Sequence, residues 1–280
     1  MYKLNLKCTN YFMSKYIISL GFFLGAIAEN TFAQSIVPIQ LDRPDQTECP
    51  FIVPKGYIQV ENGFTFEKID NNTKTINFPT ALWKYGVNEK FELRLITETA
   101  YTKQNTETNI GLMPITVGFK SSLCEEKGLM PKTSFIGHLT TSNVGSKTFH
   151  TAFVAPSFRF TMQHTLTEKV ALAYNIGAEW DGENATPTYI YTLTTGVSLT
   201  NRLGAYAELY GFIGTKSSTN HRADGGFTYL VSNNFMVDIS GGVGLTNNAP
   251  KQYVSLGVSY RFRVKAHPSP PKGREKESGI

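Results

Sequence analysis

The sequence lacks a long apolar run of the kind that crosses a membrane as a helix. Its N-terminal apolar run, Tyr16 to Ala28, is about a dozen residues, short of the roughly 20 that a spanning helix needs. Lysines precede this run, and Thr31 and Ala33 supply small residues where a signal peptidase reads the chain. We predict that residues 1–33 are a signal peptide cleaved before Gln34. A retained anchor helix is the alternative.

The body of the chain also lacks an excess of charge of one sign. The net charge is +5, but residues 1–33 hold three lysines and one glutamate, and the tail from 264 to 280 holds four basic and two acidic residues. The remainder is nearly neutral, which gives no reason to propose nucleic-acid binding. Three prolines amid lysine and glutamate predict that residues 264–280 are a disordered basic tail.

Cysteine is scarce. Of the three in the chain, Cys8 lies in the predicted signal peptide, and only Cys49 and Cys124 remain after export. An oxidising periplasm would allow these two to form a disulfide, and the alternative is two separate thiols. Neither has the neighbouring His or Cys spacing of a metal site, so we predict no metal and no other cofactor.

What the sequence does have is alternation of apolar and polar residues with a period of two, which is the period of β-strands. The clearest example is Val170 to Asp181, where apolar residues occupy every second position up to Trp180. Twelve such segments follow Gly56: Tyr57 to Lys68, Thr75 to Gly86, Lys90 to Tyr101, Ile110 to Ser121, Lys132 to Thr141, Phe149 to Gln163, Glu168 to Asp181, Pro187 to Thr200, Leu203 to Gly214, Ala223 to Ser232, Phe235 to Thr246 and Gln252 to Arg263.

The length of these segments separates a membrane barrel from a soluble sandwich. Sandwich strands average about five or six residues, whereas a tilted strand that crosses a bilayer needs about ten. Every second connection is short, as periplasmic turns of such barrels are. We therefore predict an all-β fold: a transmembrane antiparallel up-and-down β-barrel of about twelve strands over residues 57–263, in the cell outer membrane of a Gram-negative cell. Its partners would be membrane lipid and, through the aromatic-ended strand Tyr260-Arg261-Phe262, the outer-membrane assembly machinery.

Charged residues recur on the polar face of the predicted strands, which would face the barrel lumen. The best candidates for a functional site are Glu92, Arg94 and Glu98 on one strand and Arg159 on another. Burying an unpaired charge costs several kcal/mol. Two interpretations follow: a salt-bridged set of side chains that stiffens the barrel, or a lining that sets charge selectivity or orients a solute.

The segment between the signal peptide and the first strand, residues 34–56, contains four prolines and cannot form a regular helix or a central strand. It must either hang in the periplasm or fold into the mouth of the barrel. If it folds in, Asp42, Arg43 and Asp45 could pair with lumen charges and act as a plug.

Catalytic motifs are absent from the sequence, which has no Gly-x-Ser-x-Gly and no glycine-rich loop that opens a helix. An outer-membrane barrel can still be a phospholipase that uses Ser and His on its lipid face. His150 is the candidate, because its strand position points outward, whereas His138 points inward and His221 is expected in a loop. We predict that the protein is not an enzyme.

Asp42-Arg43-Pro44-Asp45-Gln46-Thr47-Glu48, followed by Val53-Pro54-Lys55-Gly56-Tyr57, resembles the N-terminal signature of the outer-membrane family of the MetA pathway of phenol degradation. The stretches from Lys84 to Arg94 and from Pro131 to Gly137 are similar to the same family, and the resemblance covers Leu41 to Phe262. It implies an outer-membrane barrel, with the expectation that small, hydrophobic or aromatic compounds pass through it.

The sequence thus predicts a passive channel or transporter for small molecules. The alternatives are a closed structural or surface-interaction barrel whose loops bind a partner, and a lipid-face phospholipase.

Overall fold

A computed structural model describes residues 37–214 and 219–264 of the chain. The predicted signal peptide, 1–33, lies outside the described residues, as does the predicted tail apart from Val264, whose N–H donates to the Gly56 carbonyl at 2.9 Å. Within the described ranges there is no helix with the length and apolar character needed to cross a bilayer.

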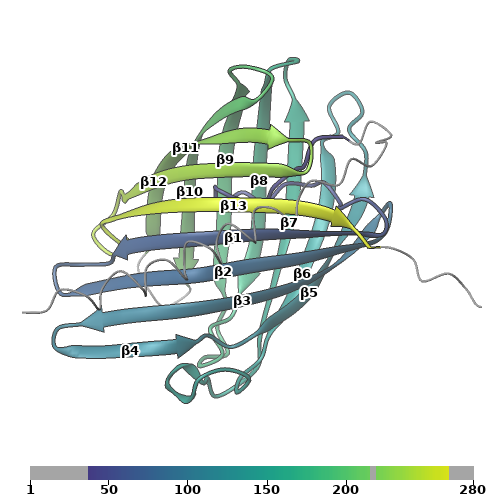
Figure 1. Cartoon of the computed structure of the whole chain (residues 1–280). Coiled ribbons are helices and arrows are strands. Elements are labelled where there is room, and N and C mark those ends of the chain that lie inside the picture. Colours follow the sequence, from purple (N-terminus) through teal and green to yellow (C-terminus); the bar gives the residue numbers. More distant parts are fainter. Residues whose placement is uncertain (1–36, 215–218, 265–280) are drawn as a thin grey trace, which may run out of the picture. The chain divides into compact units, whose positions relative to one another are not determined.

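One antiparallel sheet curls round into a closed barrel (Figure 1). It closes because β1 pairs with β2 along one edge and with β13, the last strand of the chain, along the other. The predicted all-β up-and-down barrel is therefore confirmed. The strands are β1 (Tyr57–Lys68), β2 (Thr73–Asn88), β3 (Phe91–Gln104), β4 (Glu107–Leu112), β5 (Thr116–Cys124), β6 (Lys132–Thr140), β7 (Ala155–Thr165), β8 (Val170–Glu179), β9 (Thr188–Ser198), β10 (Leu203–Gly214), β11 (Asn220–Ser232), β12 (Phe235–Gly244) and β13 (Gln252–Arg263).

The fourth predicted strand is two strands in the structure. β4 and β5 are separated by residues 113–115, and both pair with β3, one with each half of it. Pro114 lies in the break and has no N–H to donate to a neighbouring strand. Together β4 and β5 fill one position of the wall, which keeps the barrel at the twelve positions that the sequence predicts.

β7 begins later than predicted, at Ala155 instead of Phe149. The preceding residues, 141–154, form a loop with one short 3₁₀ turn, η1 (Lys147–Phe149), and this loop bonds to the free edge of β4. The Ser146 N–H donates to the Leu112 carbonyl at 2.8 Å, and the Leu112 N–H donates to the Ser146 hydroxyl at 2.9 Å. Non-local pairing with β4 thus overrides the local strand tendency of this stretch.

Burial in this barrel is the reverse of burial in a soluble protein. On β12, Ile239 faces outward and is 48% exposed, whereas Asp238 and Ser240 face the lumen and are 6% and 4% exposed. The same inversion holds along β13, where Leu256 is exposed and Ser255 is buried. Apolar side chains that face outward are stable only where lipid surrounds them, so this pattern is the one expected of a membrane barrel.

The two ends of the barrel differ in their connections. The end that holds Gly56 and Val264 also holds the short turns β2–β3, β7–β8, β9–β10 and β11–β12, together with the longer connection between Cys124 and Lys132. Longer loops, including 141–154, lie at the opposite end. Because short turns face the periplasm in outer-membrane barrels, we refer to the first end as periplasmic.

Candidate functional site in the barrel lumen

Residues 38–56, here called the lumen segment, run among the inward-facing side chains of the barrel. The segment enters at the periplasmic end, where the Ile39 N–H donates to the Asn233 carbonyl at 2.9 Å in the β11–β12 turn. Ile39 is fully buried, and Asp42 and Val53 are nearly so. Its prolines prevent a regular helix or central strand, so its backbone polar groups need partners on the wall.

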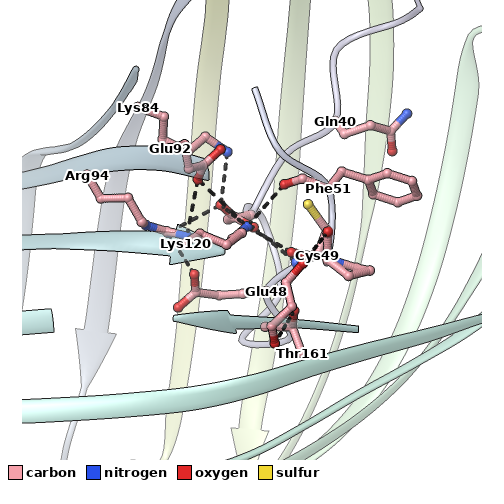
Figure 2. A network of polar contacts seen from close by, with 12 residues as sticks. Gln40, Glu48, Cys49, Phe51, Lys84, Glu92, Arg94, Lys120 and Thr161 are labelled. Carbon is pink, nitrogen blue, oxygen red and sulfur yellow. Dashed lines mark hydrogen bonds and ion pairs between the residues drawn. The ribbon is translucent and has the colours of Figure 1, made fainter. Parts of the chain in front are cut away.

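Asp42 is the centre of the polar network in the lumen. Its carboxylate accepts hydrogen bonds from the Lys84 ammonium at 2.9 Å and the Lys120 ammonium at 2.8 Å, and it lies 3.2 Å from the Arg94 guanidinium. These three cations come from β2, β5 and β3, and Figure 2 shows them converging on the segment. Burial alone would raise the pKa of the Asp42 carboxyl, but Lys120, Lys84 and Arg94 outweigh burial and hold this pKa well below its usual range.

Inward-facing carboxylates of the wall also hold the segment. The Asp42 N–H donates to Glu61 Oε2 at 2.9 Å, and the Val53 N–H donates to Glu92 Oε2 at 2.8 Å. Glu61 in turn contacts the Lys84 ammonium. Charges on the wall and charges on the segment therefore satisfy one another, which is the condition for keeping ion pairs away from water.

Glu48 forms a second attachment of the segment. Its carboxylate lies 2.7 Å from Arg94 Nη2 and 3.7 Å from Arg159 Nη1, and Arg159 also donates to the Gln46 carbonyl at 3.0 Å. The Asn175 side chain on β8 binds the Glu48 backbone on both sides, accepting from its N–H at 2.7 Å and donating to its carbonyl at 3.0 Å.

Arg43 is held in a notch made by two glycines. Its guanidinium lies 3.2 Å from Asp238 and donates to Ser255 Oγ at 2.9 Å. Gly63 on β1 and Gly257 on β13 are direct partners across the strand pair that closes the barrel. A Cβ at residue 63 would overlap the guanidinium, and one at residue 257 would overlap the Asp238 carboxylate. The absence of these two side chains is what makes room for the ion pair.

Thr47 attaches the segment to the opposite wall. Its hydroxyl donates to Glu208 on β10 and bonds to Thr194 on β9 at 2.8 Å, and the Gln46 N–H donates to the other oxygen of Glu208 at 2.8 Å. Asp45 faces an acid instead of a cation. Burial and then the Glu208 carboxylate raise the pKa of Asp45 well above its usual range.

Cys49 and Cys124 are free thiols in the structure, so no disulfide joins them. Cys49 lies on the lumen segment, where its carbonyl accepts from the Lys120 ammonium at 2.8 Å. Cys124 ends β5 at the barrel wall, with its sulfur 3.7 Å from the Pro131 carbonyl. Of the two alternatives, a disulfide or two separate thiols, the structure contains the separate thiols.

The four predicted site residues divide into two groups. Glu92, Arg94 and Arg159 all contact the lumen segment. Glu98 does not: on the outer half of β3, its carboxylate accepts from Thr80 Oγ1 at 2.8 Å. Sequence reasoning overlooked Lys84. Because Lys84 stands between the apolar Trp83 and Tyr85, the alternation of β2 already placed its side chain on the lumen face. It also overlooked the uncharged partners Asn175, Thr194 and Thr192, the last of which accepts a hydrogen bond from the Thr47 hydroxyl at 2.6 Å. A polar residue on an inward-facing position carries no further signal in the sequence.

The histidines differ from expectation in two places. His150 is not on a strand; it follows η1 in the 141–154 loop, with Nε2 3.2 Å from the Gly145 carbonyl. This removes the residue on which the phospholipase alternative rested. His221 lies in β11 instead of a loop, and its Nδ1 is 2.6 Å from the Tyr191 hydroxyl. In the described part of the chain, no cluster of three or more His, Cys, Asp or Glu side chains could hold a metal ion.

A family model described as “Putative MetA-pathway of phenol degradation” matches residues 41–262. The chain belongs to this family. The match begins next to Asp42 and ends in β13, so the family's sequence pattern includes most of the lumen segment as well as the barrel. The resemblance of the opening motif is thereby confirmed.

Two solved outer-membrane structures are similar to this chain. The COG4313 outer-membrane channel from Pseudomonas putida F1 is 12% identical, with a TM-score of 0.57 over 76% of this chain and 97% of that one. The CymD monoaromatic hydrocarbon channel is 12% identical, with a TM-score of 0.47 over 77% of this chain and 90% of that one. At this identity the first likeness establishes the fold alone. No curated protein sequence matches the chain. The protein is an outer-membrane β-barrel.

Proposed function

We propose that this barrel is a passive channel for small molecules, and that the lumen segment narrows it. The observation that carries the proposal is the position of Asp42, which three cations from three strands hold in the lumen. Carboxylates of the wall also contact these cations, since Glu61 contacts Lys84 and Glu92 lies 3.6 Å from Arg94, but neither of them contacts all three cations. Here a separate stretch of chain supplies the central anion, and such a stretch can leave without unfolding the wall.

The solute class that we propose is small aromatic compounds. The family description, which refers to phenol degradation, supports this class. The titles of the two similar structures name an outer-membrane channel and a monoaromatic hydrocarbon channel. We further propose that the protein has no catalytic role and that β13 is the strand presented to the outer-membrane assembly machinery.

The competing function is a closed structural barrel whose loops bind a partner. One observation favours it: the lumen charges are buried and paired, with Lys84, Glu92 and Lys120 at most 1% exposed. The two functions differ in whether a correctly folded barrel passes ions. Heat-modifiable gel mobility establishes folding, and single-channel recording in a planar bilayer then decides between them. Steady conductance supports the channel, and a folded but silent barrel supports the closed structure.

Glu98 provides a test of the lining in the full-length chain. Its carboxylate is half-buried in the lumen, and its hydrogen-bond donor is the neutral Thr80. An ion that passes at roughly 6 Å in water-like surroundings interacts with one charge by about 0.7 kcal/mol. The charge attracts a cation and repels an anion by this amount, so it changes the cation-to-anion ratio by about 1.4 kcal/mol, or about tenfold. We therefore expect Glu98→Gln to lower the cation-to-anion permeability ratio about tenfold at low salt, measured as a shift in reversal potential.

Glu107→Gln is the matched control, because Glu107 is exposed at the outer end of β4. It removes the same charge on the same side of the membrane but outside the lumen. Equal shifts for the two variants would mean that Glu98 acts only through the surface potential, and the lining role would be lost.

A further inference from the structure

The two sides of the lumen are filled very differently at the periplasmic half. On the β1–β5 side, long charged side chains reach inward and are buried, among them Lys84, Arg94 and Lys120. On the β8–β10 side, most inward positions near the periplasmic end carry small side chains; the exception is Tyr206, whose ring lies against Gly226 of β11. The small residues are Ala171, Ala173, Gly196, Ser198 and Gly204, as the register with Thr194 and Tyr206 shows.

A cavity of about 420 Å³ occupies the space that these small residues leave. The lumen segment bounds it on one side, through residues that include Ile39 and Leu41, and strands β7–β12 bound it on the other. Gly196 on β9 lines the cavity, and a Cβ built there would meet no atom within 4 Å. The space next to Gly196 is therefore unoccupied by protein atoms, whereas the space next to Gly63 and Gly257 is occupied by Arg43 and Asp238.

The cavity opens at the periplasmic end, and Thr47 and Thr194 are among the residues that line its inner end. The β7–β8 and β9–β10 turns form its rim, with Lys169 and Arg202. At the inner boundary, Thr47 bonds to Glu208 and Thr194, and these two come from neighbouring strands of the same wall. A solute that moved along this wall would meet the Thr47–Glu208 contact first.

We infer that solutes cross the periplasmic half of the barrel along the β8–β10 wall, through this cavity, and that the Thr47–Glu208 contact controls its inner end. The inference rests on the proposed channel function. The lining specifies the class of solute. Inside the charged rim, the lining includes the apolar Ile39 and Leu230 and the hydroxyl-bearing Thr165, Thr194 and Thr228. This combination fits compact uncharged molecules that carry an apolar face and a hydroxyl group.

Cysteine modification tests the path in the full-length protein. In a background with Cys49→Ser and Cys124→Ser, Gly196→Cys places a thiol in the open space of the cavity. Benzyl methanethiosulfonate, a bulky uncharged reagent, attaches a benzylthio group through a disulfide and releases methanesulfinate. We expect complete modification, measured by mass spectrometry, to lower the single-channel conductance at least twofold.

Ser122→Cys is the matched control. Ser122 also faces inward two residues from the periplasmic end of its strand, but it lies on β5, on the filled side. Modification there should leave conductance unchanged. The inference is overturned if fully modified Gly196→Cys conducts normally, or if both modified variants lose conductance equally. A folded barrel that is silent before modification, both with and without residues 38–49, instead refutes the channel function itself.

Discussion

Removing residues 38–49 is expected to raise the single-channel conductance severalfold and to shift the selectivity of the lumen toward anions. The deletion takes out the part of the lumen segment that holds Asp42 and Glu48, which fill the centre of the barrel. It leaves residues 34–37 after the predicted cleavage position, so export should not change. The wall itself keeps every strand pair, because residues 38–49 belong to none of them.

The charge balance gives the direction of the selectivity change. In the intact network four cations face four acids; the cations are Lys84, Arg94, Lys120 and Arg159, and the acids are Asp42, Glu48, Glu61 and Glu92. Deletion removes two of these acids and none of these cations. This network is left with four cations against two acids. The whole deletion removes the acids Asp42, Asp45 and Glu48 and the cation Arg43, so the lumen lining becomes more positive than in the intact chain, and a more positive lining favours anions.

Replacing residues 38–49 with a Gly/Ser sequence of equal length is the informative control. It keeps the chain length and removes the side chains that dock, so it should behave as the deletion does. Unchanged conductance in both variants, with heat-modifiable mobility retained, would show that the segment does not limit passage.

Asp42→Lys in the intact chain is expected to open the lumen nearly as far as the deletion does. The new ammonium would lie among Lys84, Arg94 and Lys120, so an attraction becomes a repulsion at the best-paired point of the segment. Breaking a buried ion pair costs about 3–5 kcal/mol. This cost corresponds to a more than hundredfold change in the equilibrium between the docked and the released lumen segment. We therefore expect conductance close to that of the deletion variant, recorded under the same conditions.

A compensating change distinguishes docking from general damage. Lys84→Glu together with Asp42→Lys restores an opposite pair in reversed order, and we expect conductance to fall back toward the wild-type value. Asp70→Lys makes the same substitution in the exposed turn between β1 and β2 and should have no such effect. If the double variant conducts as much as Asp42→Lys alone, Asp42 does not hold the segment through these cations.

The alternation of apolar and polar residues along each strand was sufficient to predict the barrel fold. β1, β10 and β13 have the predicted ends, and the inverted burial of β12 and β13 follows from their sequence. The reason is local: neighbouring residues of a strand face opposite sides, so which side faces lipid is encoded within about ten residues. The errors arose where a distant contact decides, as for β7, whose start is delayed by the bonding of loop 141–154 to β4.

In the lumen too, local sequence determined some features and distant contacts decided others. The sequence by itself determined that charges face inward, and it left residues 34–56 with two possible places, outside or within the barrel mouth. Tertiary structure placed Asp42 beside Lys84, Arg94 and Lys120, and Arg43 beside Asp238 over two paired glycines. These partners are set by the register of strands far apart in the chain and by the closure of β1 on β13. No local pattern records such distances, which is why only the folded barrel could decide which charges meet.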